Sequence, residues 1–150
     1  MANTSALSEI VEPFVRKWLK QKYGEKFENK NVALTLTTGG KHKFDAVSVD
    51  RSIVADVKSS SARNDNASSR KFVAGTFRSA IVDVDYLSLI IAKKKILVLT
   101  NRDFFDYFIK RMKGKIASGI EVLYCQLPLS IRKKTGAVLL NAQREIGKKR

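Results

Sequence analysis

The stretch KFDAVSVDRSIVADVKSS, residues 43–60, restricts the possible folds more than any other part of the chain. Its two halves read as short strands, and the pair Asp50-Arg51 between them reads as a tight turn. If this pair forms the turn, residues whose numbers add up to 101 face each other across an antiparallel hairpin. Asp45 is then opposite Asp56, with Cβ atoms about 5 Å apart. Lys58 lies two residues beyond Asp56 and shares the same face.

Two carboxylates this close repel each other unless a proton or a metal ion lies between them. With Lys58 beside them, Asp45 and Asp56 form a hard-cation site of the kind that holds Mg²⁺ next to a phosphate. The alternative is a surface hairpin in which exposed Asp and Lys side chains make a cross-strand ion pair. That alternative explains the alternation poorly, because Val47 and Val54 share the face of the acids.

The charge of the chain favours a polyanionic partner. Lys and Arg number 29 against 14 Asp and Glu, which gives a formal charge of +15 over 150 residues. Nucleic acid is the first candidate partner, an anionic membrane surface is the second, and a solvated basic surface without a partner is the third. The length suits one domain with a sizeable core. We therefore expect a single domain over residues 1–150, with a mobile basic tail at 147–150.

The residue counts exclude several kinds of site. His42 and Cys125 are the only histidine and cysteine, so an intrachain disulfide and a Cys/His zinc site in a monomer are excluded. A Ser-His-Asp triad would need His42 and has no supporting motif. The first ten residues do not read as a signal peptide, and no apolar run reaches the ~20 residues that span a bilayer. We expect a cytoplasmic protein with no membrane partner.

Hydrophobic periodicity and turn residues predict a mixed α/β domain with the element order αβββαββαβα. The segment VDYLSLIIA, residues 84–92, could prolong the preceding helix or form a strand, and its β-branched content favours the strand. Asn101 or Thr100 is expected to cap the helix that follows. The predicted helices cover residues 5–23, a segment starting near 69, 103–112 and 130–146, and the predicted strands cover 31–37, 43–49, 52–58, 86–92, 95–100 and 120–127.

A first helix with a carboxylate, an antiparallel meander and then the pattern D-x10-D-x-K resembles the PD-(D/E)XK nuclease superfamily. The matching residues are Asp45, Asp56, Val57 and Lys58, with Glu12 or Glu9 in the first helix. The resemblance covers about residues 5–100, and Phe44 stands where the family usually has a proline. It implies an α/β protein with a restriction-endonuclease-like core, in which helices flank a mixed central sheet with an N-terminal antiparallel meander.

The resemblance also implies a metal-dependent DNA endonuclease that hydrolyses phosphodiester bonds with Mg²⁺ or Mn²⁺. Asp45, Asp56 and the main-chain carbonyl of Val57 would bind the metal. Lys58 would position or help to deprotonate the attacking water and would stabilise the pentacovalent state. DNA is the implied partner.

The acid of the first helix would bind a second metal or orient the catalytic lysine. Glu12 lies at the edge of the apolar stripe of this helix, and Glu9 points nearly opposite to it. We therefore prefer Glu12 as the catalytic and metal-binding acid. The alternative for both is an ordinary acid near a helix N-terminus, stabilised by the helix dipole.

Polar and basic residues near the hairpin are candidate contacts to the DNA backbone. They are Lys41, His42, Lys43, Ser59, Arg63, Arg70 and Lys71. The alternative is a solvated turn before the first acid and a flexible loop after the lysine.

Homing endonucleases and archaeal Holliday-junction resolvases are small single-domain members of this superfamily, and the resolvases are similar in size, charge and order of elements. Because one active site per chain cuts one strand, cutting of both strands requires two chains, and we expect a homodimer or a higher homo-oligomer. The alternative function is a basic nucleic-acid-binding module without catalysis, on a degenerate nuclease fold.

Overall fold

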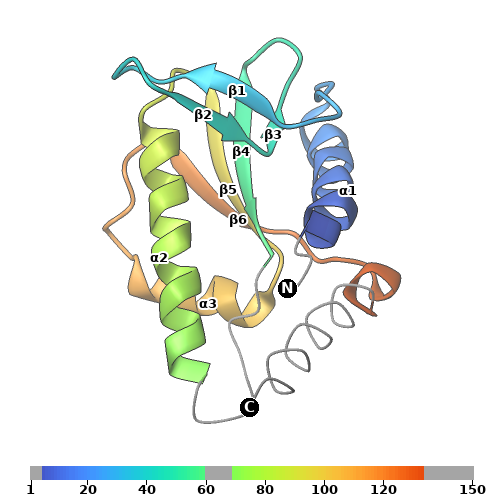
Figure 1. Cartoon of the computed structure of the whole chain (residues 1–150), viewed down its shortest axis with the longest axis vertical. Coiled ribbons are helices and arrows are strands. Elements are labelled where there is room, and N and C mark those ends of the chain that lie inside the picture. The colour runs from blue at the N-terminus through green and yellow to red at the C-terminus, as the bar shows by residue number, and fades with distance from the viewer. Residues whose placement is uncertain (1–4, 60–68, 134–150) are drawn as a thin grey trace.

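A computed structural model of the chain describes residues 5–59 and 69–133 (Figure 1). Residues 129–133 are helical. The elements are α1 (Ser5–Tyr23), β1 (Val32–Thr35), β2 (Lys41–Phe44), β3 (Ala46–Val47), β4 (Ile53–Lys58), α2 (Ser69–Ser88), β5 (Lys94–Leu99), α3 (Arg102–Arg111) and β6 (Ile120–Tyr124).

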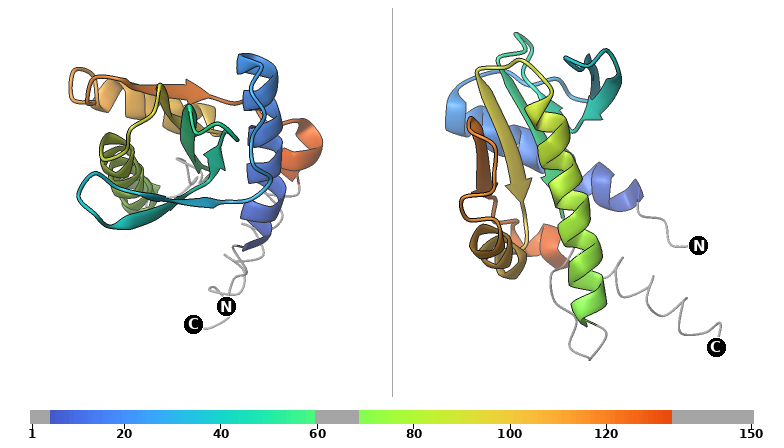
Figure 2. Two further views of the ribbon diagram at one scale, coloured as in Figure 1. Left: turned by 90° about the horizontal axis from the view of Figure 1, so that it is seen from above. Right: turned by 90° about the vertical axis from the view of Figure 1, so that its left-hand side faces the viewer.

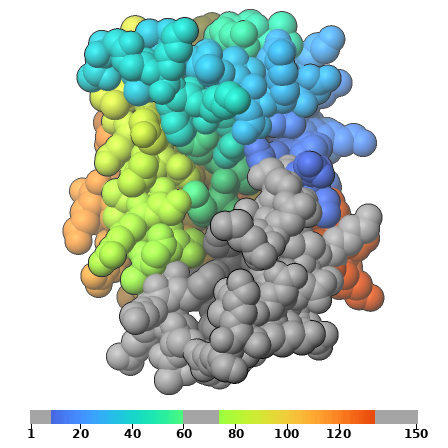
Figure 3. Space-filling view, in the orientation of Figure 1, coloured from blue at the N-terminus to red at the C-terminus, as the bar shows by residue number. Residues whose placement is uncertain are grey.

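The strands form two sheets. A four-stranded sheet has the order β3-β4-β5-β6, in which β3 and β4 are antiparallel while β4, β5 and β6 are parallel neighbours. A separate antiparallel pair, β1-β2, lies at the top of the face shown in Figure 3, above α2 and beside α1. The chain is therefore a mixed α/β protein with a mixed central sheet, as expected.

Helices cover both faces of the larger sheet (Figure 2). The side chains of α1 pack on one face, against Ala55 and Ile96 among others. Those of α2 and α3 pack on the other face, against Val54 and Leu97. The central strand β5 is buried on both faces, which explains its continuous apolar run.

The hairpin between β3 and β4 has the predicted register. Ala46 pairs with Ala55 and Val47 pairs with Val54, so both pairs of residue numbers add up to 101. The connection is longer than the predicted tight turn: the N–H of Ser48 donates to the carbonyl of Ile53, and Asp50-Arg51 are the middle pair of residues 49–52. In it Arg51 has a positive φ of 65°. The alternation along β4 then sends Asp56 to the same face as Val54, toward α2.

The predicted continuous strand over residues 43–49 is wrong. Lys41–Phe44 forms β2 and pairs with β1, whereas Ala46–Val47 forms β3 and pairs with β4, so the chain changes sheet at Asp45. Phe44 and Ala46 are both fully buried, but they belong to the clusters on opposite faces. In a regular strand these two side chains would share a face. The three-stranded meander is therefore broken at its middle strand.

The predicted strand over residues 86–92 is also wrong, because α2 continues to Ser88. Ala80, Val84 and Leu87 are buried at helical spacing on the core side of α2. This spacing outweighs the β-branched content that favoured a strand. Beyond the helix Ile90 is buried, while Ile91 is 91% exposed.

The remaining elements agree with prediction to within a few residues. Gly24 ends α1 with a positive φ of 70°, and its N–H donates to the carbonyl of Lys20. β6 ends at Tyr124, earlier than expected. Most of the predicted helix over 130–146 and the tail at 147–150 lie outside the described residues. Within the described ranges, no helix has the length and apolar character needed to cross a lipid bilayer.

The cap of α3 allows a direct test of this local structure. The side chain of Asn101 accepts a hydrogen bond from the N–H of Phe104 at 2.9 Å. Asn101→Ala should lower the free energy of unfolding by about 1 kcal/mol, because that N–H loses its acceptor. Asn101→Asp keeps an acceptor and should retain most of the stability. Urea unfolding followed by circular dichroism measures both, and an equal loss in the two variants would contradict the cap.

Candidate active site

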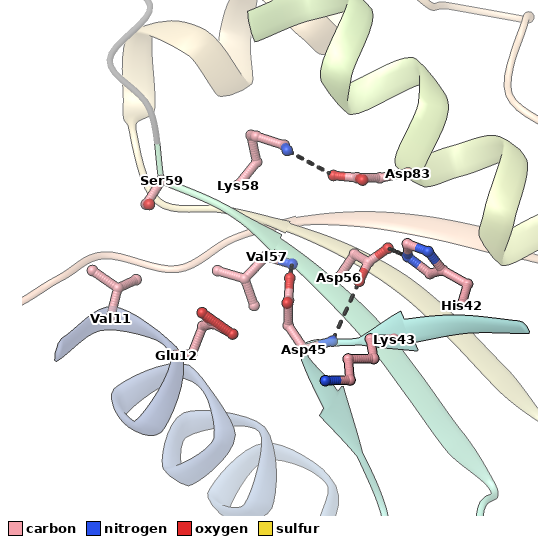
Figure 4. A pocket seen from close by; sticks show the side chains of 10 residues that line it. All are labelled: Val11, Glu12, His42, Lys43, Asp45, Asp56, Val57, Lys58, Ser59 and Asp83. Carbon is pink, nitrogen blue, oxygen red and sulfur yellow. Dashed lines mark hydrogen bonds and ion pairs between the residues drawn. The ribbon is translucent and has the colours of Figure 1, made fainter. Parts of the chain in front are cut away.

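A cavity of about 250 Å³ lies between α1, the end of β2, the end of β4 and α2 (Figure 4). Its walls are Val11, Glu12, His42, Lys43, Asp45, Asp56, Val57, Lys58, Ser59 and Asp83. Eight of these ten are residues that the sequence singled out, and Val11 and Asp83 are the two that it did not. The cavity therefore collects side chains from four separate segments of the chain.

The two acids of the hairpin lie next to each other. Because β3 begins at Ala46, which pairs with Ala55, the part of β4 after Ala55 has no strand partner on this side among the described residues. There the carboxylate of Asp45 supplies the acceptor that a neighbouring strand would otherwise provide. Its Oδ2 accepts a hydrogen bond from the N–H of Val57 at 2.8 Å. In return, the N–H of Asp45 donates to Oδ1 of Asp56 at 3.3 Å. The structure thus brings together the two acids that the register predicted.

Arg16 of α1 supports the bend in the chain at Asp45 through its guanidinium group. It is only 9% exposed. Its Nε donates to the carbonyl of Asp45 at 2.9 Å, and its Nη2 donates to Oδ1 of Asn31 at 2.6 Å. Asn31 in turn donates to Oδ1 of Asp45 at 3.4 Å. Sequence reasoning missed this support, although an arginine one turn after Glu12 on the buried side of the helix was an available signal.

Burial disfavours the charged form of both acids. It raises the pKa of Asp45 to about 7, against the lowering effect of the Val57 N–H, and the carboxylate of Glu12 adds to the rise. It raises the pKa of Asp56 to about 8, with further contributions from the charges of Asp45 and Asp83. Across the described residues, Oδ2 of Asp56 is the one buried side-chain oxygen or nitrogen without a hydrogen-bond partner. This pocket therefore favours a proton or a cation beside the acids.

The first-helix acid in the cavity is Glu12. It is 8% exposed and lies close enough to raise the pKa of Asp45. Its Oε1 is 3.9 Å from Nη2 of Arg16, at the outer limit of an ion pair. Glu9 is exposed. The geometry therefore agrees with the choice of Glu12 over Glu9.

Lys58 is turned toward α2. Its Nζ donates to Oγ of Ser79 at 2.7 Å and lies 3.1 Å from Oδ2 of Asp83, as Figure 4 shows for the aspartate. Burial raises the pKa of Asp83, while the ammonium of Lys58 lowers it. Sequence reasoning missed Asp83. The available signal was an acid one helical turn after Ser79, flanked by the apolar residues 81, 82 and 84.

His42 belongs to the cavity as well as to β2. Its ring stacks on Tyr86 with centroids 3.8 Å apart and meets the edge of Phe44 at 4.6 Å. Its Nε2 is 3.5 Å from Oδ2 of Asp56, a contact too long to satisfy that oxygen as a hydrogen bond. Burial lowers the pKa of His42, and the charge of Asp83 partly offsets this effect. The aromatic contacts thus aim the imidazole at the acid.

The other predicted DNA contacts are spread more widely. Lys43 and Ser59 line the cavity, and Lys41 is exposed at the start of β2. Arg63 lies outside the described residues. Arg70 and Lys71 lie in the first turn of α2, where the structure describes the backbone alone.

The donors in the cavity suit a hard cation. Carboxylate and carbonyl oxygens are the ligands that Mg²⁺ prefers, and Mn²⁺ accepts the same set. In the part of the chain that the structure describes, no three His, Cys, Asp or Glu side chains gather as metal ligands would. Two carboxylates and a main-chain carbonyl do not require such a cluster. The unpaired oxygen of Asp56 and the raised pKa values of both acids fit a cation at this place.

Comparison with known proteins adds no relative. No protein-family model, no curated protein and no solved structure matches the chain. The function must therefore be argued from the cavity itself.

The raised pKa values predict that metal-free protein loses stability as the pH rises. The acids titrate near pH 4 when unfolded and near 7 and 8 when folded. In that window the folded state binds more protons, so the free energy of unfolding falls with rising pH, by a few kcal/mol in order of magnitude. Asp56→Asn should flatten the slope. Urea midpoints measured between pH 5 and 8 in EDTA test this.

Asp50→Asn is the matched control for the pH series. Hydrogen bonds from Ser52 and Ser48 hold the pKa of Asp50 at about 2, outside the measured window. This variant should keep the wild-type slope whatever its effect on the turn. An unchanged slope in Asp56→Asn would show that the acid is already ionised in the folded protein.

Arg16→Met should lower the free energy of unfolding by about 2 to 4 kcal/mol, because buried acceptors lose their charged donor. Arg16→Lys should recover only part of this, since lysine lacks the planar fork that reaches several acceptors. Lys17→Met, on the exposed side of the same helix, is the control in chemical denaturation. Equal stability of Arg16→Met and Lys17→Met would exclude a structural role for the arginine.

Proposed function

We propose that this protein is a metal-dependent endonuclease that hydrolyses phosphodiester bonds in DNA. One observation carries the proposal. Asp45, Asp56 and Lys58 line a single cavity at the open end of a β-hairpin, and Glu12 of α1 reaches the same cavity. The formal charge of +15 supports a nucleic-acid substrate.

We also propose a restriction-endonuclease-like core of the PD-(D/E)XK type. The order of α1, antiparallel strands, β4, α2 and β5 is the order that the resemblance requires. Helices on both faces of a mixed sheet, with the acids at the end of β4, support the same assignment. The break at Asp45 is compatible with it, because the acid stays beside β4.

Asp45, Asp56 and the main-chain carbonyl of Val57 would hold Mg²⁺ or Mn²⁺, with Glu12 as an additional acid. When bound, the cation would lower the pKa of a coordinated water and neutralise charge on the phosphate. The acids prepare the place for it, since each is fixed by a backbone hydrogen bond near the other. Their raised pKa values mean that cation binding displaces protons from the pair.

The basic side chains supply the substrate side of the site. The ammonium of Lys58 lies in the cavity wall, where it would stabilise negative charge growing on the phosphate. Lys43 at the rim and Lys41, an exposed residue of β2, would contact backbone phosphates. Ser59 in the cavity wall is a further proposed contact to the DNA backbone. Arg63, Arg70 and Lys71 remain proposed contacts from the sequence alone.

The described part of each chain holds one cavity with these acids, and such a cavity would cut one strand. Cleavage of both strands of a duplex or junction therefore requires two copies, and a homodimer or higher homo-oligomer is part of the proposal.

A second candidate is a nucleic-acid-binding module without catalysis, on a degenerate nuclease fold. It is favoured by the position of Lys58, whose ammonium is engaged by α2 rather than by the acids of the hairpin. The charge of the chain supports both candidates equally, so cleavage has to decide.

Cleavage of supercoiled, linear and branched DNA tests the proposal. The protein should nick or cut at least one of these substrates with Mg²⁺ or Mn²⁺, but not with EDTA. Asp56→Ala should lower the cleavage rate by at least about 100-fold while DNA affinity stays within a few fold, because the acid serves chemistry rather than binding. Gel electrophoresis and fluorescence anisotropy measure the two quantities.

Asp106→Ala is the matched control, since this aspartate is exposed on α3. It should cleave at the wild-type rate. Intact substrates in every metal, together with metal-independent binding, would leave only the binding module.

A further inference from the structure

The ammonium of Lys58 is held by two side chains from α2. Nζ donates to Oγ of Ser79 at 2.7 Å and lies 3.1 Å from Oδ2 of Asp83. Ser79 and Asp83 are four residues apart, so they lie one above the other on the same face of the helix. Two oxygen acceptors from the same helix, α2, therefore contact the ammonium nitrogen of Lys58 at the end of β4.

This contact removes most of the freedom of the lysine. A lysine side chain has several rotatable bonds and loses much of its conformational entropy when it is fixed. Here the side chains of Lys58 and Asp83 are only 19% and 15% exposed, so solvent screens their attraction little. An ammonium has three N–H donors. Ser79 and Asp83 engage two of them, which leaves one for a substrate.

Placing a carboxylate at position 83 disfavours the folded protein unless that carboxylate is needed to hold Lys58. Burial raises its pKa, which means that the surroundings disfavour its charge. Its charge also raises the pKa values of Asp45 and Asp56. A neutral or apolar residue would avoid both effects. Asp85, two residues later on the same helix, is exposed and avoids them.

We propose that Asp83 is a positioning residue, which together with Ser79 fixes the ammonium of Lys58 at the wall of the cavity and thereby sets the rate of phosphodiester hydrolysis. The inference rests on the proposed function and deepens it. Asp83 touches the lysine and not the reacting atoms, so its effect should reach the reaction only through Lys58.

Steady-state cleavage separates this role from a structural one. Asp83→Asn should lower kcat by about 10- to 100-fold, as the loss of a supporting group does, with KM for DNA unchanged. Ser79→Ala should lower kcat less, and Asp83→Glu should restore part of the rate. Asp85→Asn should match the wild type. If Asp83→Asn does not fold by circular dichroism, Ser79→Ala and Asp83→Glu carry the test.

A double-mutant cycle checks the route of the effect. When Lys58→Met has already lowered the rate, adding Asp83→Asn should lower it no further, because both changes remove the same contribution. A further loss as large as in the wild-type background would show that Asp83 acts by another route and would overturn the inference.

Side-chain NMR of ¹⁵N-labelled lysine gives a readout that does not depend on cleavage. The ammonium of Lys58, assigned by its loss in Lys58→Met, should give a resolved, slowly exchanging signal in the wild type and in Asp85→Asn. That signal should broaden or disappear in Asp83→Asn. A signal that Asp83→Asn leaves unchanged overturns the inference.

The two proposals fail in different ways. Wild-type protein that cleaves nothing overturns the proposed function, and this inference with it. Active wild-type protein whose Asp83→Asn variant cleaves as fast as Asp85→Asn, or faster, overturns the inference alone. A faster variant would mean that the aspartate withdraws the lysine from the site.

Discussion

The hydrogen bond from the N–H of Val57 to the carboxylate of Asp45 holds the site together. β3 is too short to pair with the whole of β4, so the end of β4 would otherwise leave a partly buried N–H without a partner. A side chain fills the role of the missing strand, and that side chain is an acid. The same bond that completes the sheet edge thus places one carboxylate beside Asp56.

The cavity gathers acidic side chains in an otherwise basic protein. Asp45, Asp56, Asp83 and Glu12 line it in a chain whose formal charge is +15. Burial and mutual repulsion make ionisation of the hairpin acids unfavourable, which is the kind of local cost that functional sites carry and cores avoid. Under the proposed function the net positive charge and the acidic cavity have complementary roles: the first would attract a polyanion, and the second would accept a cation.

The sequence predicted the parts of the site that depend on local pairing. The alternation along residues 46–47 and 53–58 and the turn between them determine the register, and the register brings Asp45 near Asp56. The roles of Arg16 and Asp83 in the site were not predicted, because their positions depend on how α1 and α2 pack against the hairpin. The break at Asp45 was not predicted for a related reason. Phe44 and Ala46 are buried on opposite faces because of how the helices pack, and the alternation of the sequence alone does not reveal this.

The distribution of the cavity walls along the chain has a consequence for biosynthesis. α2 supplies Asp83, and it packs against β5, which is made after it. A nascent chain that has only just released the hairpin from the ribosome carries Glu12, Asp45 and Asp56, but it has no docked α2 to complete the wall. The wall of the cavity therefore forms late, once β5 has emerged, so the cavity stays incomplete while the polypeptide is still being translated.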